Sequence, residues 1–302
     1  MSSKTSTQQI VLITGATAGI GRTTALYLAK QGRHVIATGR NTAALATLRA
    51  EAEASSLKLD TVELDVTSAD SIARAVASVD QLTNHHGVDV LVNNAGYGAL
   101  GPSAEITDAE MRRQYDTNVF GLMSVTRAFL PAMRARRAGR IINVSSLGGR
   151  FTLPYFGVYN STKYAVESLS DALRYELHAF GIFVTLIEPG AIRTNFESTA
   201  LSGVGAFDQS AYGESLKKVD ALSKRMDRVA AEPIVIARAI ERAVRVRRPA
   251  ARYVAPRMNH MVLMLKSVMP TCAFDWSMRK MGYLTPKDLG LTGKSVPSAL
   301  KA

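Results

Sequence analysis

Short runs of apolar residues alternate along the chain with longer segments in which apolar residues recur every three or four positions. The runs are β-branched and aliphatic and are bounded by turn residues, which is typical of buried strands. The longer segments, such as residues 20–30, 42–53 and 68–82, have the period of a helix. This alternation predicts βαβ units and a parallel sheet covered by helices on both faces. The expected strands are residues 10–14, 34–38, 58–65, 88–94, 139–146, 182–189 and 251–255.

The pattern weakens after residue 190. Residues 193–226 read as helices and loops with small residues, and a helix is expected from about residue 232 to 246, with Pro233 suitably at its start. Right-handed crossovers then give an α/β fold with a doubly wound, Rossmann-like sheet of about seven strands in a single domain over residues 9–256. Residues 1–8 are expected to be a flexible N-terminus, and residues 257–302 a helical C-terminal extension rich in Met and basic residues.

Composition narrows the class of protein. Apolar residues make up 47% of the chain and charged residues 21%, which is ordinary for a globular protein in water. The single cysteine, Cys272, excludes an intramolecular disulfide and fits a reducing compartment. The chain has no run of about eighteen uncharged apolar residues that would predict a spanning helix. Its first residues are polar and unlike a signal peptide. We therefore expect a cytoplasmic protein.

Charge is high and unevenly placed. The net charge is +12, and residues 232–302 contain thirteen Lys or Arg against four Asp or Glu. Such a balance can indicate nucleic acid, an anionic membrane surface or a phosphorylated ligand. The sequence has no helix-turn-helix or zinc signature, so we expect no nucleic acid partner. His178, His260 and Cys272 have no partners at metal-ligand spacing, so we expect no metal.

A glycine-rich turn, TGATAGIG at residues 14–21, follows the first expected strand and opens a helix. Gly15, Gly19 and Gly21 allow a tight turn and the close approach of a pyrophosphate to the helix N-terminus. Three glycines are more than a plain tight turn needs. Their position therefore predicts a dinucleotide site.

The end of the second strand indicates which dinucleotide. An acidic residue there binds the ribose 2′-hydroxyl of NAD, whereas an Arg accommodates the 2′-phosphate of NADP. The run HVIATGRN has no acidic residue, and Arg40 follows at once. Guanidinium groups match phosphate geometry with paired donors, so we favour NADP(H). The alternative is that Arg40 is a solvated loop residue.

The stretch YNSTK places Tyr159 and Lys163 four residues apart at the start of a long amphipathic segment. In a helix these side chains lie on one face, about one turn apart. A free Tyr has a pKa near ~10, and a neighbouring cation favours its phenolate. The pair is therefore a candidate acid–base site. Taken alone, such a stretch is ordinarily read as a surface i,i+4 pair, and only the motifs that precede it favour a site.

These motifs, in this order, resemble those of the short-chain dehydrogenase/reductase superfamily. The matching stretches are the glycine turn, NNAG at 93–96, Asn118, VSS at 144–146, the Tyr159/Lys163 pair and PGAIRT at 189–194. The resemblance covers roughly residues 8–195. It implies that Tyr159 is the general acid–base and that Lys163 lowers the pKa of Tyr159 and bonds the nicotinamide ribose.

The resemblance also implies the remaining site residues. Ser146 would steady the substrate oxygen, and Asn118 would support a water chain to Lys163. Asp65 would cap the adenine pocket, and Thr194 would bond the nicotinamide carboxamide. The implied cofactor contacts are Gly15, Thr17, Gly19, Ile20, Gly21, Arg40, Asp65, Val66, Asn93, Ala95, Gly96, Tyr159, Lys163, Pro189, Gly190, Ile192 and Thr194.

Residues 196–230 and the Met-rich tail are expected to bind the substrate. Phe151, Leu153, Tyr155 and Phe156 add apolar and aromatic surface between Ser146 and Tyr159, and Met adapts to irregular apolar shapes. This predicts a lipophilic alcohol, ketone or aldehyde. The layout is similar to the steroid, retinoid and long-chain-alcohol branch of the superfamily.

The tail has two interpretations, an apolar lid over the pocket or a peripheral contact with anionic lipid. The resemblance further implies a homodimer or homotetramer, formed through helices that start near Asp116 and Tyr155.

Two other functions compete with an oxidoreductase. One is an epimerase or dehydratase on the same fold, which usually has G-x-x-G-x-x-G spacing and a longer substrate domain. The other is a non-catalytic NADP-binding regulator, a class that commonly loses the Tyr or the Lys. The chain keeps Tyr159 and Lys163 and has neither epimerase feature, which favours the oxidoreductase.

Overall fold

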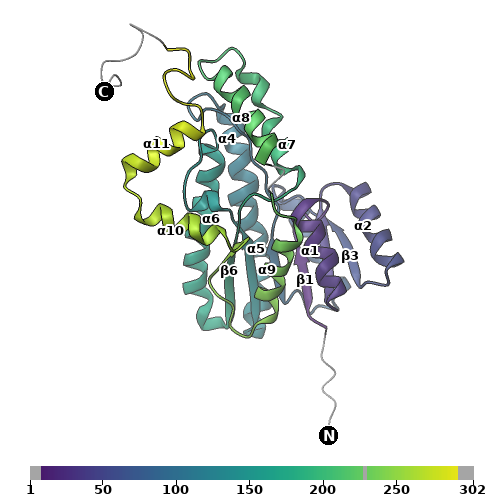
Figure 1. Ribbon diagram of the computed structural model, residues 1–302. Coiled ribbons are helices and arrows are strands. Elements are labelled where there is room, and N and C mark those ends of the chain that lie inside the picture. The colour runs from purple at the N-terminus through teal and green to yellow at the C-terminus, as the bar shows by residue number, and fades with distance from the viewer. Residues whose placement is uncertain (1–7, 227–229, 292–302) are drawn as a thin grey trace.

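A parallel seven-stranded sheet forms the centre of the protein in the computed structural model, which describes residues 8–226 and 230–291 (Figure 1). The strand order is β3-β2-β1-β4-β5-β6-β7, so the order reverses between β1 and β4. In an open α/β sheet, ligands bind outside the carboxyl ends of the strands at this switch point. The strands are β1 (Ile10–Ile13), β2 (His34–Gly39), β3 (Leu59–Glu63), β4 (Val90–Asn93), β5 (Gly139–Val144), β6 (Ile182–Pro189) and β7 (Arg252–Ala255).

Helices connect the strands and extend the chain beyond them. The α-helices are α1 (Gly19–Lys30), α2 (Thr42–Ala54), α3 (Ala69–Leu82), α4 (Asp108–Tyr115), α5 (Leu122–Arg136), α6 (Gly157–Leu177), α7 (Asn195–Leu201), α8 (Gly213–Met226), α9 (Ile234–Arg245), α10 (Asn259–Val268) and α11 (Thr271–Met281). Shorter turns are the π segment η1 (Asp116–Gly121) and the 3₁₀ segments η2 (Leu147–Gly149), η3 (His178–Phe180) and η4 (Val204–Phe207).

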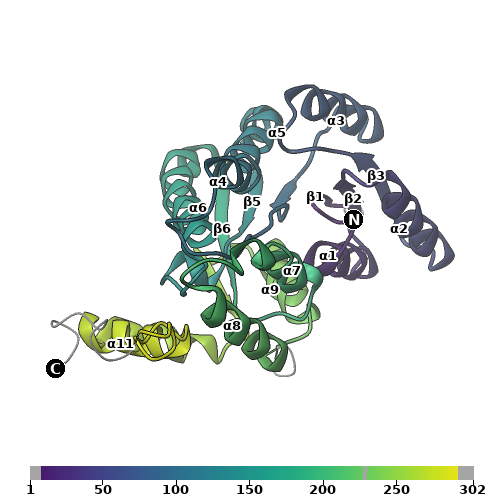
Figure 2. The ribbon, with the colours of Figure 1, turned by 90° about the horizontal axis from the view of Figure 1, so that it is seen from above.

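The helices form two layers with the sheet between them. Figure 2 shows α1 and α9 on one face, and α3, α5 and α6 on the other. Side chains alternate between the faces of a strand, so β1 contributes to both cores. Val11 and Ile13 pack in the core that includes Leu28 of α1. Leu12 packs in the opposite core with Phe129 of α5. The predicted doubly wound α/β fold is confirmed.

One helix boundary differs from the prediction for a local reason. The helix expected to start near Asp116 begins at Asp108, because the Thr107 side chain caps it by accepting from the Glu110 backbone N–H. From there the chain stays helical through η1 into α5. A π segment inside a helix often marks a functional position, and this one contains Asn118.

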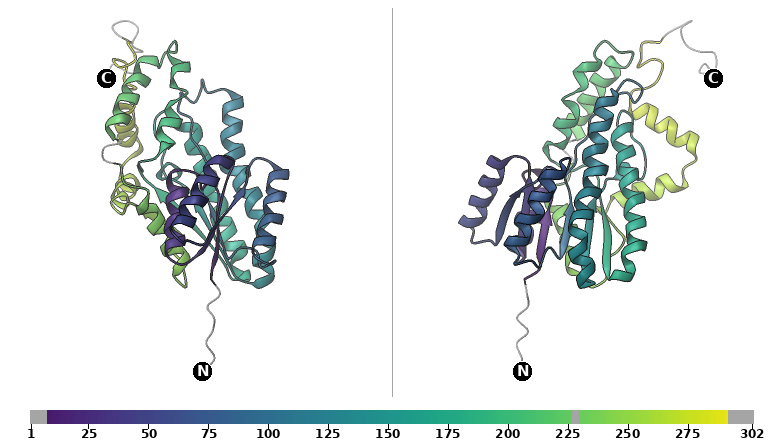
Figure 3. Two further views of the ribbon diagram at one scale, coloured as in Figure 1. Left: turned by 90° about the vertical axis from the view of Figure 1, so that its right-hand side faces the viewer. Right: turned by 180° about the vertical axis from the view of Figure 1, so that it is seen from behind.

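The C-terminal segment leaves the body of the molecule and returns to it. Helices α10 and α11 project beside the sheet as a hairpin (Figure 3). After α11 the chain packs against α8, where Ser215 Oγ donates to the Gly282 carbonyl at 2.9 Å or the Tyr283 carbonyl at 2.6 Å. Within the described ranges, none of the helices is long and apolar enough to cross a bilayer. The expected flexible N-terminus lies outside the described residues, apart from Gln8.

Candidate active site

A cavity of about 1060 Å³ opens at the carboxyl ends of the strands, at the switch point between β1 and β4. Its walls come from the β1–α1 turn, the segments after β2, β3 and β4, η2, the start of α6 and the segment from β6 to α7. Most of the residues that the sequence predicts for the site line this cavity. They are Gly15, Thr17, Gly19, Ile20, Arg40, Asp65, Val66, Ala95, Gly96, Ser146, Tyr159, Lys163, Pro189, Gly190, Ile192 and Thr194.

The glycine turn has the geometry of a phosphate cradle. Gly15 and Gly19 have φ angles of +64° and +51°, which side chains rarely adopt. A Cβ at Gly21 would collide with the Gly15 carbonyl oxygen. The N-cap residue of α1, Ala18, makes no side-chain capping bond, and the first turn has no acidic residue. The backbone N–H groups at the start of α1 therefore suit an anionic group such as a pyrophosphate.

Two adjacent asparagines after β4 have different positions. Asn94 lines the cavity, and its Nδ2 donates to the backbone carbonyls of Thr14 and Gly15 at 3.0 and 3.1 Å. This ties the glycine turn to the end of β4. Asn93, which the sequence analysis assigned to the cofactor, is buried away from the cavity lining and donates to Thr126 and Asn143.

Arg40 and Asp65 lie at the edge of the cavity under the ends of β2 and β3. Arg40 is exposed, directly after the last residue of β2. Burial raises the pKa of Asp65, but hydrogen bonds from Thr67 and the nearby Arg40 charge outweigh it, so the pKa of the Asp65 carboxyl is lowered overall. This edge therefore combines a positive guanidinium with a fixed carboxylate.

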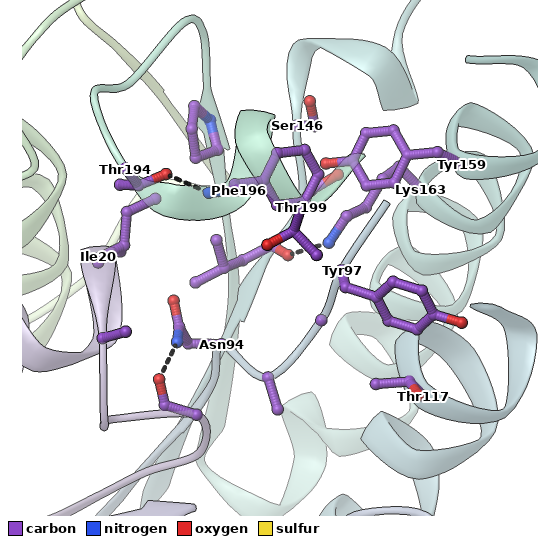
Figure 4. A pocket seen from close by; sticks show the side chains of 18 of the residues that line it. Ile20, Asn94, Tyr97, Thr117, Ser146, Tyr159, Lys163, Thr194, Phe196 and Thr199 are labelled. Atoms are coloured by element: carbon purple, nitrogen blue, oxygen red, sulfur yellow. Dashed lines mark hydrogen bonds between the residues drawn. The ribbon is translucent and has the colours of Figure 1, made fainter. Parts of the chain in front are cut away.

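Tyr159 and Lys163 are buried on one face of α6 and point into the cavity, as Figure 4 shows. The Lys163 Nζ lies 5.7 Å from the centroid of the Tyr159 ring and donates to the Val144 carbonyl at 2.9 Å. This bond anchors the ammonium to the end of β5. The YNSTK stretch is therefore not a surface pair.

Burial governs the acidity of both groups. It raises the pKa of Tyr159 to about 12, although a hydrogen bond with Ser146 acts in the opposite direction. Burial also lowers the pKa of Lys163 to about 8, while the Glu167 carboxylate opposes that shift. The Tyr159 phenol is therefore protonated at neutral pH. The Lys163 amine loses its proton at a pH only slightly above neutral.

Ser146 and Asn118 flank this pair. Ser146 caps η2 by accepting from the Gly148 N–H at 3.0 Å, which keeps its hydroxyl on the cavity wall. Asn118 is buried outside the lining. Its Nδ2 donates to the Tyr97 carbonyl and the Thr162 hydroxyl, and its Oδ1 accepts from the Tyr97 N–H. Asn118 thus fixes the segment after β4 against α6, behind Gly96 and beside Lys163.

Apolar side chains enclose the opposite side of Tyr159. The Phe196 ring lies 5.2 Å from the Tyr159 ring, and Phe151, Leu153 and Phe156 also line the cavity. Tyr155 does not line the cavity, contrary to the expectation. Its φ is +64°, and its hydroxyl lies 2.6 Å from Ser215 Oγ in a separate core.

The site prediction missed several lining residues, among them Asn94, Tyr97, Phe196 and Thr199 (Figure 4). Asn94 belongs to the NNAG motif at residues 93–96. Phe196 and Thr199 lie in residues 196–230, the segment expected to bind the substrate, within which the sequence indicates no individual residue. Among the described residues, no group of three or more His, Cys, Asp or Glu side chains could hold a metal ion.

Comparison with known proteins places the chain in a family. The sequence model of the short chain dehydrogenase family matches residues 9–204. A 3-ketodihydrosphingosine reductase from Bacteroides thetaiotaomicron is 34% identical, over 90% of this chain and 97% of that protein. An NADPH-dependent 3-dehydrocapnine reductase from Ornithobacterium rhinotracheale is 32% identical, over 85% of this chain and 90% of its own.

Two further similarities concern the branch and the fold. Retinol dehydrogenase 8 from Homo sapiens is 39% identical over 64% of this chain and 62% of that protein. A short-chain dehydrogenase from Streptomyces avermitilis superposes with a TM-score of 0.72 at 30% identity, covering 91% of this chain and 97% of the other. With the ordered motifs and the sheet topology, these similarities show that the chain belongs to the short-chain dehydrogenase/reductase superfamily and resembles its steroid, retinoid and long-chain-alcohol branch.

Proposed function

We propose that this protein is an NADP(H)-dependent oxidoreductase that interconverts a lipophilic secondary alcohol and its ketone, or an aldehyde and its alcohol. The observation that carries the proposal is the meeting of Ser146, Tyr159 and Lys163 in one cavity, between the glycine turn and an apolar wall. When bound, the nicotinamide cofactor supplies or accepts the hydride. The chain supplies position, proton transfer and exclusion of water.

The residues of the cavity fit a dinucleotide. The open N-terminus of α1 and the turn of Gly15, Gly19 and Gly21 would hold the pyrophosphate. Asp65 and Val66, which line the cavity after β3, would enclose the adenine. Pro189, Gly190, Ile192 and Thr194 would flank the nicotinamide end.

Arg40 supports NADP(H) rather than NAD(H). It lines the cavity directly after β2, where an acidic residue would otherwise meet a ribose 2′-hydroxyl. Its exposed guanidinium can take a 2′-phosphate through paired hydrogen bonds. The similarity to an NADPH-dependent reductase, over 85% of this chain, agrees with this choice.

Tyr159 donates a proton to the substrate oxygen during reduction and accepts it during oxidation. Because burial keeps its pKa high, the phenol is protonated at neutral pH, which is the state that donates to the oxygen of a ketone during reduction. Ser146 would hydrogen-bond the same oxygen and hold it beside the phenol. The Lys163 ammonium stabilises the phenolate that the proton transfer leaves. These roles favour reduction at neutral pH.

The substrate is inferred to be lipophilic. Phe151, Leu153, Phe156 and Phe196 give the substrate side of the cavity an apolar wall next to Tyr159. Such a wall binds hydrocarbon through burial of apolar surface. Relatives named for 3-ketodihydrosphingosine and 3-dehydrocapnine support a long-chain ketone as the substrate class.

We also propose that the protein is cytoplasmic and self-associates through the outer face of η1 and α6. Phe120, Tyr164 and Tyr175 are exposed large aromatic residues of these two elements, with Tyr175 67% exposed. Tyr115 of the adjoining helix bonds Ser161 at 3.0 Å, which joins both elements into one surface. A second copy would cover these rings in a dimer or tetramer.

A panel of ketones tests the proposed function. The panel has short, medium and long alkyl chains, and NADPH consumption is followed by absorbance. We expect the ratio kcat/KM to rise with chain length, and we expect NADH to be a poor substitute. Turnover limited to small hydrophilic ketones would refute the lipophilic assignment, and a failure of every carbonyl compound would refute the oxidoreductase.

A further inference from the structure

The C-terminal hairpin, residues 257–281, presents an apolar surface that the rest of the described chain does not cover. Helices α10 and α11 contain no buried residue. Met261, Met264 and Val268 are 69%, 66% and 73% exposed, and their spacing places them along one stripe of α10. Other exposed large apolar residues of the hairpin are Met258, Val262, Leu265, Trp276 and Met281. A patch of this kind on a folded protein indicates a contact with a partner or a membrane.

The same hairpin is basic. It contains Arg257, Lys266, Arg279 and Lys280 against one acidic residue, Asp275, which gives a net charge of +3. These charged side chains are exposed. Trp276 is 60% exposed and lies beside Lys280, with 5.9 Å between Nζ and the ring centroid. Apolar side chains with an interfacial Trp and nearby cations are the combination that binds anionic lipid surfaces.

We propose that this hairpin docks the protein on the surface of an anionic lipid bilayer, with the α10 stripe inserted at the acyl boundary. The occupant is a bilayer rather than a second copy of the chain, because a second hairpin would bring another +3 to the same interface. Neither helix needs to span the membrane, and both lie in the interface plane as amphipathic helices do.

The docking surface adjoins the cavity. The Phe274 ring of α11 packs edge-on against Phe151, a cavity-lining residue, with 6.1 Å between the ring centroids. At the other end of the hairpin, a Cβ at Gly190 would collide with the Asn259 side chain, so the start of α10 also contacts the cavity wall. A lipophilic substrate held in the bilayer would therefore leave it close to the cavity. This last step rests on the proposed function, whereas the docking itself does not.

Vesicle co-sedimentation of the full chain tests the docking. The vesicles are phosphatidylcholine alone or phosphatidylcholine with 30 mol% phosphatidylglycerol, where about a third of the lipid carries charge. We expect binding to the anionic vesicles to be at least about tenfold tighter than to neutral ones and to weaken as salt is raised. Equal sedimentation with both vesicle types, or with neither, would overturn the proposal.

Variants identify the surface. The double variant Met264→Glu/Val268→Glu should lose at least about tenfold in vesicle affinity, because it places two charges on the inserted stripe. A charge-matched control, Leu82→Glu/Phe180→Glu, alters exposed apolar residues outside the hairpin and should bind as the wild type does. The triple variant Lys266→Ala/Arg279→Ala/Lys280→Ala should lose most of the salt-sensitive binding. Unchanged binding by the hairpin variants would overturn the assignment.

Two further readouts separate the alternatives. Light scattering after gel filtration detects a hairpin-mediated dimer. Suppose that the wild type is a dimer that does not bind vesicles, and that the Met264→Glu/Val268→Glu variant is a monomer. This result would refute lipid docking and would show that a second copy of the chain covers the hairpin. Contrary to the expectation that the Met-rich tail binds the substrate, no described residue of the tail lines the cavity. Turnover of a short, water-soluble ketone should therefore be unchanged in Met264→Glu/Val268→Glu. Vesicle binding by a wild type that reduces no ketone would support docking while refuting the proposed function.

Discussion

The Lys163 ammonium nitrogen lies 5.7 Å from the centre of the Tyr159 ring, one helical turn further along α6, and is fixed there by the Val144 carbonyl. Both side chains are buried, and burial shifts the pKa of each group in the direction that favours its neutral form. The pair therefore combines a phenol that retains its proton with an amine that is close to losing one. This has a direct consequence for activity as a function of pH.

Ketone reduction should decline as pH rises through about 8, the pKa to which burial lowers Lys163. Tyr159 stays protonated over this range, because burial raises its pKa to about 12. The decline therefore reports loss of the Lys163 charge that stabilises the phenolate. In Lys163→Arg the cation persists to higher pH, so the alkaline decline should move upward even if the maximal rate falls. A pH profile of kcat/KM checks this, and an identical alkaline limb in both proteins would contradict the assignment.

Replacing Arg40 should change the cofactor. Arg40→Asp removes the guanidinium that would meet a 2′-phosphate and introduces an acceptor for a 2′-hydroxyl. We expect the ratio of kcat/KM for NADPH to that for NADH to fall by tenfold or more, which corresponds to the about 1.5 to 3 kcal/mol of a charge-assisted hydrogen bond. Arg74→Asp, an exposed Arg on α3, is the matched control and should leave the ratio unchanged. An unaltered ratio in Arg40→Asp would show that another residue reads the phosphate.

The glycine turn should not accept even one methyl group. In Gly21→Ala the new Cβ would collide with the Gly15 carbonyl, so the turn must shift and the affinity for NADPH should fall more than about tenfold. Gly203→Ala is the control, because a Cβ there meets nothing within 4 Å and its φ is −90°. Titration of NADPH fluorescence measures both. Equal affinity in the two variants would argue against a pyrophosphate at this turn.

Phe196 should determine how well a long substrate is held. In Phe196→Ala the apolar wall next to Tyr159 loses a ring, and kcat/KM for a long-chain ketone should fall by about tenfold to a hundredfold. Activity with a short ketone and the affinity for NADPH should change little. Steady-state rates on a chain-length series check this. A uniform loss for every substrate would mean that Phe196 orients Tyr159 rather than the substrate.

The fold was readable from the sequence because its signals are local and repeated. Each strand is a short apolar run, each helix has its own period, and the crossover rule leaves few topologies. The glycine turn and the Tyr159/Lys163 pair were readable for the same reason, since their residues are close in sequence.

Features that depend on the direction of a side chain could not be predicted from the sequence. Asn93 and Asn94 are consecutive, yet Asn93 turns to Thr126 and Asn143 while Asn94 faces the cavity. The positive φ of Tyr155 points its ring away from the cavity that Phe156 lines. The directions of these neighbouring side chains are known only once the three-dimensional positions of the strands and turns are known.

The high pKa of Tyr159 could not be predicted from the sequence either. The pattern YNSTK indicates a cation one turn from a phenol, which favours the phenolate. It does not show that burial outweighs this effect or that the Lys163 Nζ is held by Val144 rather than by the phenol oxygen. Burial depends on α6 packing against β6, η1 and η2, which involves residues distant in the chain.

The most direct test of the account is turnover by Tyr159→Phe, measured together with NADPH binding. This change removes one hydroxyl and keeps the ring against Phe196. We predict NADPH affinity within about twofold of the wild type, and a loss of ketone reduction of at least about a hundredfold, the usual contribution of a general acid. Turnover near the wild-type rate, with the variant folded and NADPH bound, would contradict the assignment of Tyr159 as the proton donor.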